Sequence, residues 1–168
     1  MNCHLCNSEQ DQVDSCLAGA RHNQMPSVEK IIQLEREAGL ESLDVFSRFQ
    51  AKANAVKDAL LSFLIDAKRK GQKVVGYGAA AKGNSLLNFA GVKPDLLPFI
   101  CDAAPSKQNK FMPGSHISIL APDALITADA DFVLILPWNI AKEVMEKTKP
   151  LLPTKTRYVV AVPELMVL

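Results

Sequence analysis

From Lys73 onward the sequence alternates short apolar runs with segments that carry helix signals, and this alternation most restricts the folds open to the chain. Unbroken apolar runs of about four to eight residues are typical of strands that are covered on both faces. Strands that alternate with helices favour a mostly parallel, doubly wound sheet. The expected strands are Lys73–Tyr77, Leu97–Asp102, Ile117–Leu120, Phe132–Leu136 and Tyr158–Val162.

Short helices are expected between these strands, at about Asn84–Ala90, Pro122–Thr127 and Ile140–Thr148. Pro122 suits the first position of its helix, where the missing N–H is not needed. The pattern therefore predicts an α/β fold, a Rossmann-like three-layer sandwich with a mostly parallel sheet of about five strands.

A short and a long helix are expected ahead of the sheet. Ser27 is suited to cap the short helix and Gly39 to end it. Ser42 is suited to cap the long helix, which runs to about Arg69. Its apolar residues recur at steps of three and four as Phe46, Phe49, Ala53, Val56, Leu60, Phe63 and Ala67. This stripe could form a dimer seam, but because the helix leads directly into the first strand, packing on the sheet is favoured.

Length and charge exclude several classes of function. The 168 residues suit one domain. A formal net charge of +1 lacks the basic field of nonspecific nucleic-acid binders, so no nucleic-acid partner is expected. The longest apolar runs are far shorter than the roughly 20 residues that span a bilayer, and no secretory signal is visible. We therefore expect no membrane partner and a cytoplasmic location.

The first 26 residues are polar and show no useful periodicity, which indicates a tail. Cys3 and Cys6 have the spacing of half a zinc site, and His4, Cys16 and His22 could complete it. No second Cys-x-x-Cys pair occurs, and the stretch has few apolar residues to hold such a site together. The expectation is that no metal binds, with zinc at Cys3 and Cys6 as the alternative.

The segment Val74–Ser85 joins the first expected strand to a helix through small residues and one lysine. Gly78 and Gly83 allow the backbone to approach an anion, the helix start presents free N–H groups, and Lys82 adds a positive charge. The order Lys-Gly does not fit a Walker A loop, and the glycine spacing departs from the dinucleotide pattern. Two interpretations stay open: a phosphate cradle, and a tight turn whose small residues serve packing.

Asp102 ends the second expected strand about 20 residues after the glycine segment, where Rossmann folds place an acid that accepts ribose hydroxyls. The alternative is that Asp102 orders the following turn. The next loop is long and polar, as functional loops often are. There, Lys107 and Lys110 could reach phosphate and Gln108 a sugar or base edge, while Pro113 and Gly114 fix a turn; the alternative is a solvated loop.

Trp138 and Asn139 follow the fourth expected strand, at the carboxyl edge where open α/β sheets bind ligands. Trp138 could stack on a base or sugar, or pack under the next helix. Asn139 could contact a ligand or cap that helix. No nucleophile and base pair convincingly, so no catalytic residue is expected.

Three segments in the same order resemble the C-terminal domain of C-methyltransferases that act on nucleotide-linked deoxysugars. The first is Gly76–Asn88, with the sequence GYGAAAKGNSLLN. The second comprises Asp102, the pair Lys107-Gln108 and the pair Pro113-Gly114, and the third is Phe132–Asn139. The resemblance covers roughly Pro26–Pro163.

This resemblance implies a Rossmann-like domain over residues 27–168 that contacts a nucleotide sugar. Members of the family also carry a zinc-binding domain and a central S-adenosylmethionine-binding domain that holds the methyl donor and the acid/base residues. The resemblance thus implies that the first 26 residues are a remnant of the zinc domain. It also implies that this chain alone binds no cofactor, and that methyl transfer needs S-adenosylmethionine on a separate donor-domain protein.

The sequence therefore predicts a sugar-nucleotide-binding domain of C-methyltransferase type. The alternatives are a small NAD- or S-adenosylmethionine-binding Rossmann protein and a non-catalytic interaction module. The predicted substrate-binding residues are Gly76, Gly78, Ala79, Lys82, Gly83, Asn84, Asp102, Lys107, Gln108, Pro113, Gly114, Trp138 and Asn139.

Overall fold

The computed structural model describes residues 26–168, which fall into two compact units that divide after Arg48. The first unit contains helices α2 (Pro26–Glu37) and α3 (Leu43–Ser47), and neither helix has a buried residue. Because α2 begins at Pro26, Ser27 lies inside its first turn and is not the cap that we predicted. Gly39 follows the helix with a φ of +74°, a backbone conformation that favours glycine.

The predicted long helix is wrong in one respect, because it is interrupted at Arg48. Ser42 does cap a helix, since its Oγ accepts the Asp44 N–H at 3.2 Å, but that helix is the short α3. A continuous helix would need the Asp44 carbonyl to accept the Arg48 N–H. Instead this carbonyl accepts Ser47 Oγ at 2.8 Å and the Arg48 side chain at 3.2 Å. Local side-chain hydrogen bonds therefore replace the helical one, and α4 (Phe49–Arg69) starts anew.

A seven-stranded sheet with the order β3-β4-β2-β1-β5-β6-β7 forms the centre of the second unit. The five inner strands are parallel, and the outermost strands β3 and β7 pair antiparallel. The strands are β1 Val74–Tyr77, β2 Phe99–Cys101, β3 Lys110–Phe111, β4 Ser118–Leu120, β5 Phe132–Ile135, β6 Arg157–Val160 and β7 Met166–Val167. All five predicted strands are confirmed. The edge strands, of two exposed residues each, are too short to show a period in the sequence.

The helices between the strands are α5 (Ala81–Ala90), α6 (Ala124–Ala128) and α7 (Ala141–Thr148). Two short 3-10 turns, η1 (Trp138–Ile140) and η2 (Lys149–Leu151), flank α7. All three helices were predicted, but α5 begins three residues before the expected Asn84, so that Gly83 lies inside its first turn.

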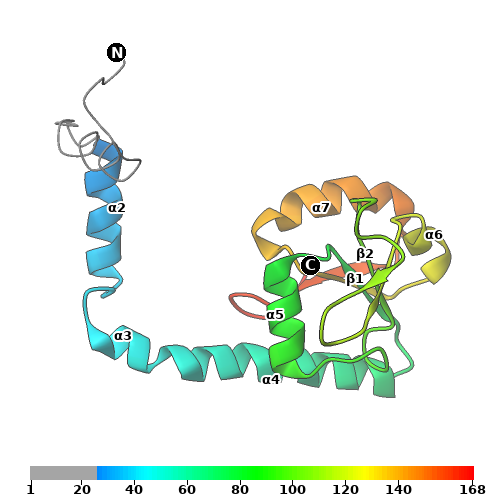
Figure 1. The fold of residues 1–168 in the computed structure, drawn as a ribbon, viewed down its shortest axis with the longest axis horizontal. Coiled ribbons are helices and arrows are strands. Elements are labelled where there is room, and N and C mark those ends of the chain that lie inside the picture. The colour runs from blue at the N-terminus through cyan, green and yellow to red at the C-terminus, as the bar shows by residue number, and fades with distance from the viewer. Residues whose placement is uncertain (1–25) are drawn as a thin grey trace, which may run out of the picture. The chain divides into compact units, whose positions relative to one another are not determined.

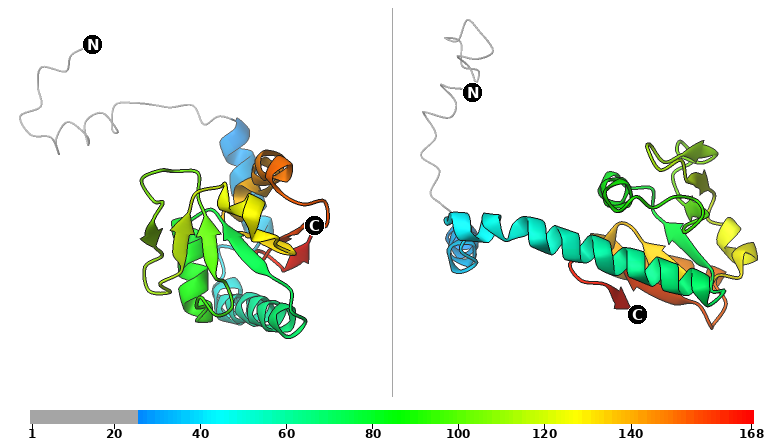
Figure 2. Two further views of the ribbon diagram at one scale, coloured as in Figure 1. Left: turned by 90° about the vertical axis from the view of Figure 1, so that its right-hand side faces the viewer. Right: turned by 90° about the horizontal axis from the view of Figure 1, so that it is seen from below.

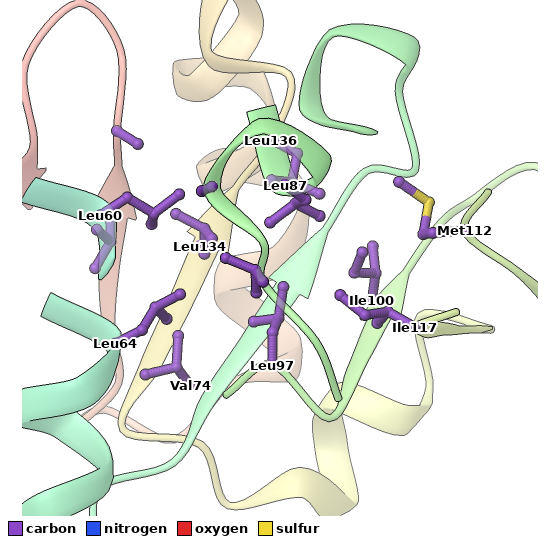
Figure 3. Packing of buried hydrophobic residues seen from close by; sticks show 14 of the residues in the cluster. Leu60, Leu64, Val74, Leu87, Leu97, Ile100, Met112, Ile117, Leu134 and Leu136 are labelled. Carbon is purple, nitrogen blue, oxygen red and sulfur yellow. The ribbon is translucent and has the colours of Figure 1, made fainter. Parts of the chain in front are cut away.

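Helices α4 and α5 cover one face of the sheet, and α6 and α7 cover the other (Figures 1 and 2). Leu60 and Leu64 of α4 are 0% and 1% exposed and pack beside Leu87 of α5 and Leu134 of β5 (Figure 3). Full burial of one such leucine contributes about 1.5–3 kcal/mol to folding. The predicted α/β three-layer sandwich is therefore confirmed.

Only the second half of the predicted apolar stripe packs on the sheet. Phe63 meets Phe132 edge to face at 5.0 Å between ring centroids, and Ala67 is buried, whereas Phe46 and Phe49 are 57% and 67% exposed. Among the residues described, no helix combines the length and apolar character that crossing a membrane requires.

A candidate ligand pocket at the carboxyl edge of the sheet

Gly78 makes the turn between β1 and α5, and its surroundings explain the glycine. Its φ is +87°, and its N–H donates to the Cys101 carbonyl at 2.7 Å, which ties the turn to β2. A Cβ at this position would lie 2.5 Å from Cδ of Pro137, in the segment after β5. Gly78 is therefore needed both for its backbone conformation and for the close approach of Pro137.

Two neighbouring glycines are also closely packed. A Cβ on Gly83 would lie 2.5 Å from Cβ of Leu136, and a Cβ on Gly76 would lie 2.6 Å from Cγ1 of Ile100. These contacts explain the small residues by packing, which is the tight-turn interpretation of the sequence. A role for the same glycines in contacting an anion stays a prediction.

The Asp102 carboxylate connects the β1–α5 turn to the long loop after β2. Its Oδ2 accepts the Ala79 N–H at 2.7 Å, and its Oδ1 accepts the Ala104 N–H at 2.8 Å. Lys107 Nζ approaches Oδ2 at 3.2 Å, and Asp102 is only 7% exposed. These contacts give Asp102 the turn-ordering role that was the alternative in the sequence, while its role toward a ribose stays a prediction.

Lys107 and Gln108 fold the long loop back onto this connection. Lys107 Nζ also donates to the Ala79 carbonyl at 3.0 Å, and Gln108 Nε2 donates to the Asp102 carbonyl at 3.0 Å. An ammonium group has three N–H donors, so two acceptors leave one donor of Lys107 available. Since the Lys107 side chain is 44% exposed, that donor can reach a ligand.

A pocket of about 640 Å³ lies between the two segments that Asp102 connects. This volume is within the range of ligand sites, about 300–1,000 Å³. One wall comes from the start of α5 and the turn before it, and the other from the loop, β3 and β4. The lining residues are Ala79, Ala80, Ala81, Asn84, Ser106, Lys107, Lys110, Phe111, Met112, Pro113 and Ile119.

The structure thus brings four of the predicted site residues to one pocket: Ala79, Asn84, Lys107 and Pro113. The Asn84 Oδ1 is buried and has no hydrogen-bond partner among the described residues. An unpaired buried acceptor costs about 1–3 kcal/mol, which a donor on a ligand or rotation of the amide would relieve.

Lys82, Trp138 and Asn139 form a separate cluster that does not line the pocket. Lys82 Nζ is 3.4 Å from Asn139 Oδ1 and 5.9 Å from the centroid of the Trp138 ring. Trp138 is partly buried and packs against the core on the α6 and α7 side. Gly114 does not line the pocket either. Its φ is +81°, and its carbonyl accepts a hydrogen bond from Lys93 Nζ at 2.7 Å.

Sequence reasoning missed six residues of the lining, and Phe111 is the most informative of them. Phe111 lies in β3, is 63% exposed and lines the pocket beside the buried Met112. The adjacent apolar pair Phe111-Met112 in an otherwise polar loop was the available signal. The other missed residues are Ala80, Ala81, Ser106, Met112 and Ile119, whereas Lys110 was already considered as a phosphate contact.

The pocket adjoins the N-terminus of α5. The cap residue Ala80 makes no side-chain hydrogen bond to the helix, so the first-turn N–H groups of Ala81, Lys82 and Gly83 receive no acceptor from it. The helix dipole makes this end positive. Lys110 adds a second ammonium group to the opposite wall, where its Nζ donates to the Ser106 carbonyl at 2.6 Å. The arrangement suits a ligand that carries negative charge at one end.

Two protic side chains close to Asp102 have raised pKa values. Burial raises the pKa of the Cys101 thiol to about 12. Burial also raises the pKa of the Tyr77 phenol, and the neighbouring Asp102 carboxylate raises it further. Both groups therefore stay protonated at neutral pH.

Between Pro26 and Leu168, no three His, Cys, Asp or Glu side chains come together as a metal site would require. Cys3 and Cys6, the predicted alternative zinc ligands, lie outside the described residues.

Comparison with known proteins gives two findings. The model of the family described as the C-methyltransferase C-terminal domain matches residues 12–163. The C-methyltransferase NovU of Streptomyces niveus is 31% identical over 147 residues, which are 88% of this chain. The chain spans 35% of the length of that relative. Since the family model covers most of the chain, this chain belongs to the C-methyltransferase C-terminal domain family.

Proposed function

We propose that this chain binds a nucleotide-linked deoxysugar and takes part in its S-adenosylmethionine-dependent C-methylation together with a separate donor domain. The observation that carries the proposal is the pocket of about 640 Å³ beside the N-terminus of α5. Its position at the carboxyl edge of a parallel sheet is where such folds bind ligands. The diphosphate belongs over the first turn of α5, where backbone N–H groups and the helix dipole favour an anion.

Lysines in and beside the pocket support an anionic ligand. Lys107 has a donor left after its bonds to Ala79 and Asp102, and Lys110 reaches the pocket from β3. Lys82, the second residue of α5, does not line the pocket, and its Nζ lies 3.4 Å from Asn139 Oδ1 and 5.9 Å from the centroid of the Trp138 ring. Under the proposal, its ammonium group turns toward a bound phosphate. These cations would compensate the negative charge of a bound phosphate, which would be costly to bury unpaired.

The described residues do not fit S-adenosylmethionine in the ordinary Rossmann manner. The acid that would accept its ribose hydroxyls, Asp102, already accepts Ala79, Ala104 and Lys107. Pro137, in the segment after β5, packs closely against Gly78 of the β1–α5 turn. We therefore assign the methyl donor to a separate domain.

Calorimetric titration of the purified chain with dTDP, NAD and S-adenosylmethionine tests the proposal. We expect saturable binding of dTDP that weakens as salt is added, because part of the affinity comes from phosphate contacts. Stronger binding of NAD or S-adenosylmethionine than of dTDP would instead favour an ordinary cofactor-binding Rossmann protein.

The Lys82→Ala variant tests the position of the diphosphate. A charge-assisted hydrogen bond contributes about 1.5–3 kcal/mol, so we expect dTDP affinity to fall about tenfold to a hundredfold. Lys142→Ala is the matched control, because it removes an exposed lysine of α7 that does not line the pocket. If Lys82→Ala keeps its circular dichroism and melting temperature and binds dTDP as tightly as the control at low salt, the phosphate role of this turn is wrong.

A further inference from the structure

Phe111 is largely exposed and contributes little of the stability that a buried phenylalanine gives. It is 63% exposed on the two-residue edge strand β3, where it pairs in register with Ser118. A buried phenylalanine stabilises a fold by about 1.5–3 kcal/mol, and an exposed one gives up most of that gain. Its neighbour Met112 is 3% exposed and supplies the apolar anchor of this segment, so Phe111 is not needed to hold the strand.

The pocket differs between the two sides from which it is built. The wall at the start of α5 contributes N–H groups and the Asn84 amide. The opposite wall contributes the exposed Phe111 ring and the apolar side chains of Met112 and Ile119, together with the ammonium groups of Lys107 and Lys110. A ligand that fits both sides has an anionic part and a flat apolar part.

We propose that Phe111 is the stacking platform for the nucleobase of the bound nucleotide, with the diphosphate directed toward α5. This inference rests on the proposed function, and it assigns a subsite for which the sequence offered Trp138 as one candidate. Trp138 does not line the pocket, is partly buried and packs on the α6 and α7 side, so it is not available to a base bound there. Phe111 is the aromatic residue of the pocket lining, and every base offers a π-face to such a ring.

The test compares three probes on the full chain: dTDP, inorganic pyrophosphate and glucose 1-phosphate. Phe111→Leu keeps an apolar side chain of similar size but removes the flat ring. We expect it to weaken dTDP binding about fivefold to a hundredfold, the range for loss of a base–aromatic stack. Pyrophosphate and glucose 1-phosphate, which have no base, should bind to wild type and variant equally. Phe111→Tyr should restore the affinity for dTDP.

Phe89→Leu is the matched control, because Phe89 is a 48% exposed phenylalanine on α5 that does not line the pocket. The ratio between wild-type and Phe111→Leu affinities should also stay constant as salt is raised, since stacking is not screened as phosphate contacts are.

Equal dTDP affinity of Phe111→Leu and wild type would overturn the stacking role and leave the proposed function standing. A loss confined to glucose 1-phosphate would also overturn it, because the ring would then face the sugar. Failure of the wild-type chain to bind dTDP would overturn both proposals.

Discussion

The Asp102 carboxylate accepts hydrogen bonds from three groups of the protein itself. Its two carboxylate oxygens accept the N–H groups of Ala79 and Ala104 and the ammonium group of Lys107, at 2.7 to 3.2 Å. Each partner belongs to a segment that borders the pocket, so a single buried side chain sets the distance between the two walls. The same residue type at the end of the second strand can thus order a loop or bind a ribose, and only the contacts distinguish these roles.

Removing this carboxylate should destabilise the protein. Asp102→Ala leaves the N–H groups of Ala79 and Ala104 without their acceptor, and we expect the free energy of unfolding in urea to fall by about 3 kcal/mol. Asp102→Asn keeps an oxygen acceptor of the same shape and should lose only about half as much. An Asp102→Ala variant that unfolds at the wild-type urea concentration would show that the carboxylate does not hold the loop.

At the scale of elements, the sequence predicts the inner strands well and the helix boundaries less well. Strands such as β5, buried on all four residues, produce an unbroken apolar run of the kind that is typical of covered strands. The break at Arg48 could not be predicted, because it depends on which donors reach the Asp44 carbonyl and not on periodicity. The start of α5 was misplaced because Gly83 resembles a helix breaker in the sequence.

The candidate site was predicted only in part, because the sequence does not show contacts between side chains. The residues of the glycine segment and of the long loop were identified, but the sequence does not tell which of them face one another. Lys107 and Asn84 share the pocket, whereas Lys82 turns toward Asn139. Phe111 was missed because a two-residue strand gives no pattern from which the exposure of its side chains could be predicted.

A substitution at Gly83 tests how closely α5 packs against the segment after β5. Gly83→Ala should gain about 1 kcal/mol of helix propensity. The new methyl group would lie 2.5 Å from Cβ of Leu136, a side chain that is 1% exposed, and overpacking of this kind costs about 1–3 kcal/mol. Because a contact this close forces the two elements apart, we expect net destabilisation in urea unfolding.

Two further variants show whether the close contact is the cause. Ser85→Ala, at an exposed position of the same helix, should leave stability within about 0.5 kcal/mol of wild type. The double variant of Gly83→Ala with Leu136→Gly should lose less than the sum of the single changes, since Leu136→Gly removes the Cβ that the new methyl group would meet. Strict additivity would mean that Gly83 and Leu136 do not limit each other.

At the scale of the whole molecule, the proposed function concerns what the pocket beside α5 contributes to methyl transfer. C-methylation requires a methyl donor and an acceptor carbon to be held within reacting distance, so two binding sites must face each other. The chain spans 35% of the length of the C-methyltransferase NovU, and in the function we propose its pocket holds the acceptor. Under our proposal, the two sites therefore belong to different domains.

We accordingly expect the purified 168-residue chain to bind dTDP but to transfer no methyl group on its own. Incubation with isotope-labelled S-adenosylmethionine and a dTDP-4-keto-deoxysugar measures this directly, by the label that appears in the sugar. Binding of dTDP to the same preparation is the necessary control, because a misfolded chain would also be inactive. Positioning of the two reactants can lower the activation barrier by about 7–11 kcal/mol. A chain without a donor site should therefore transfer methyl groups at the uncatalysed rate. Turnover that copurifies with the chain and is lost in the Lys82→Ala variant would contradict the expectation, because it would show that this one sheet holds the donor as well as the acceptor.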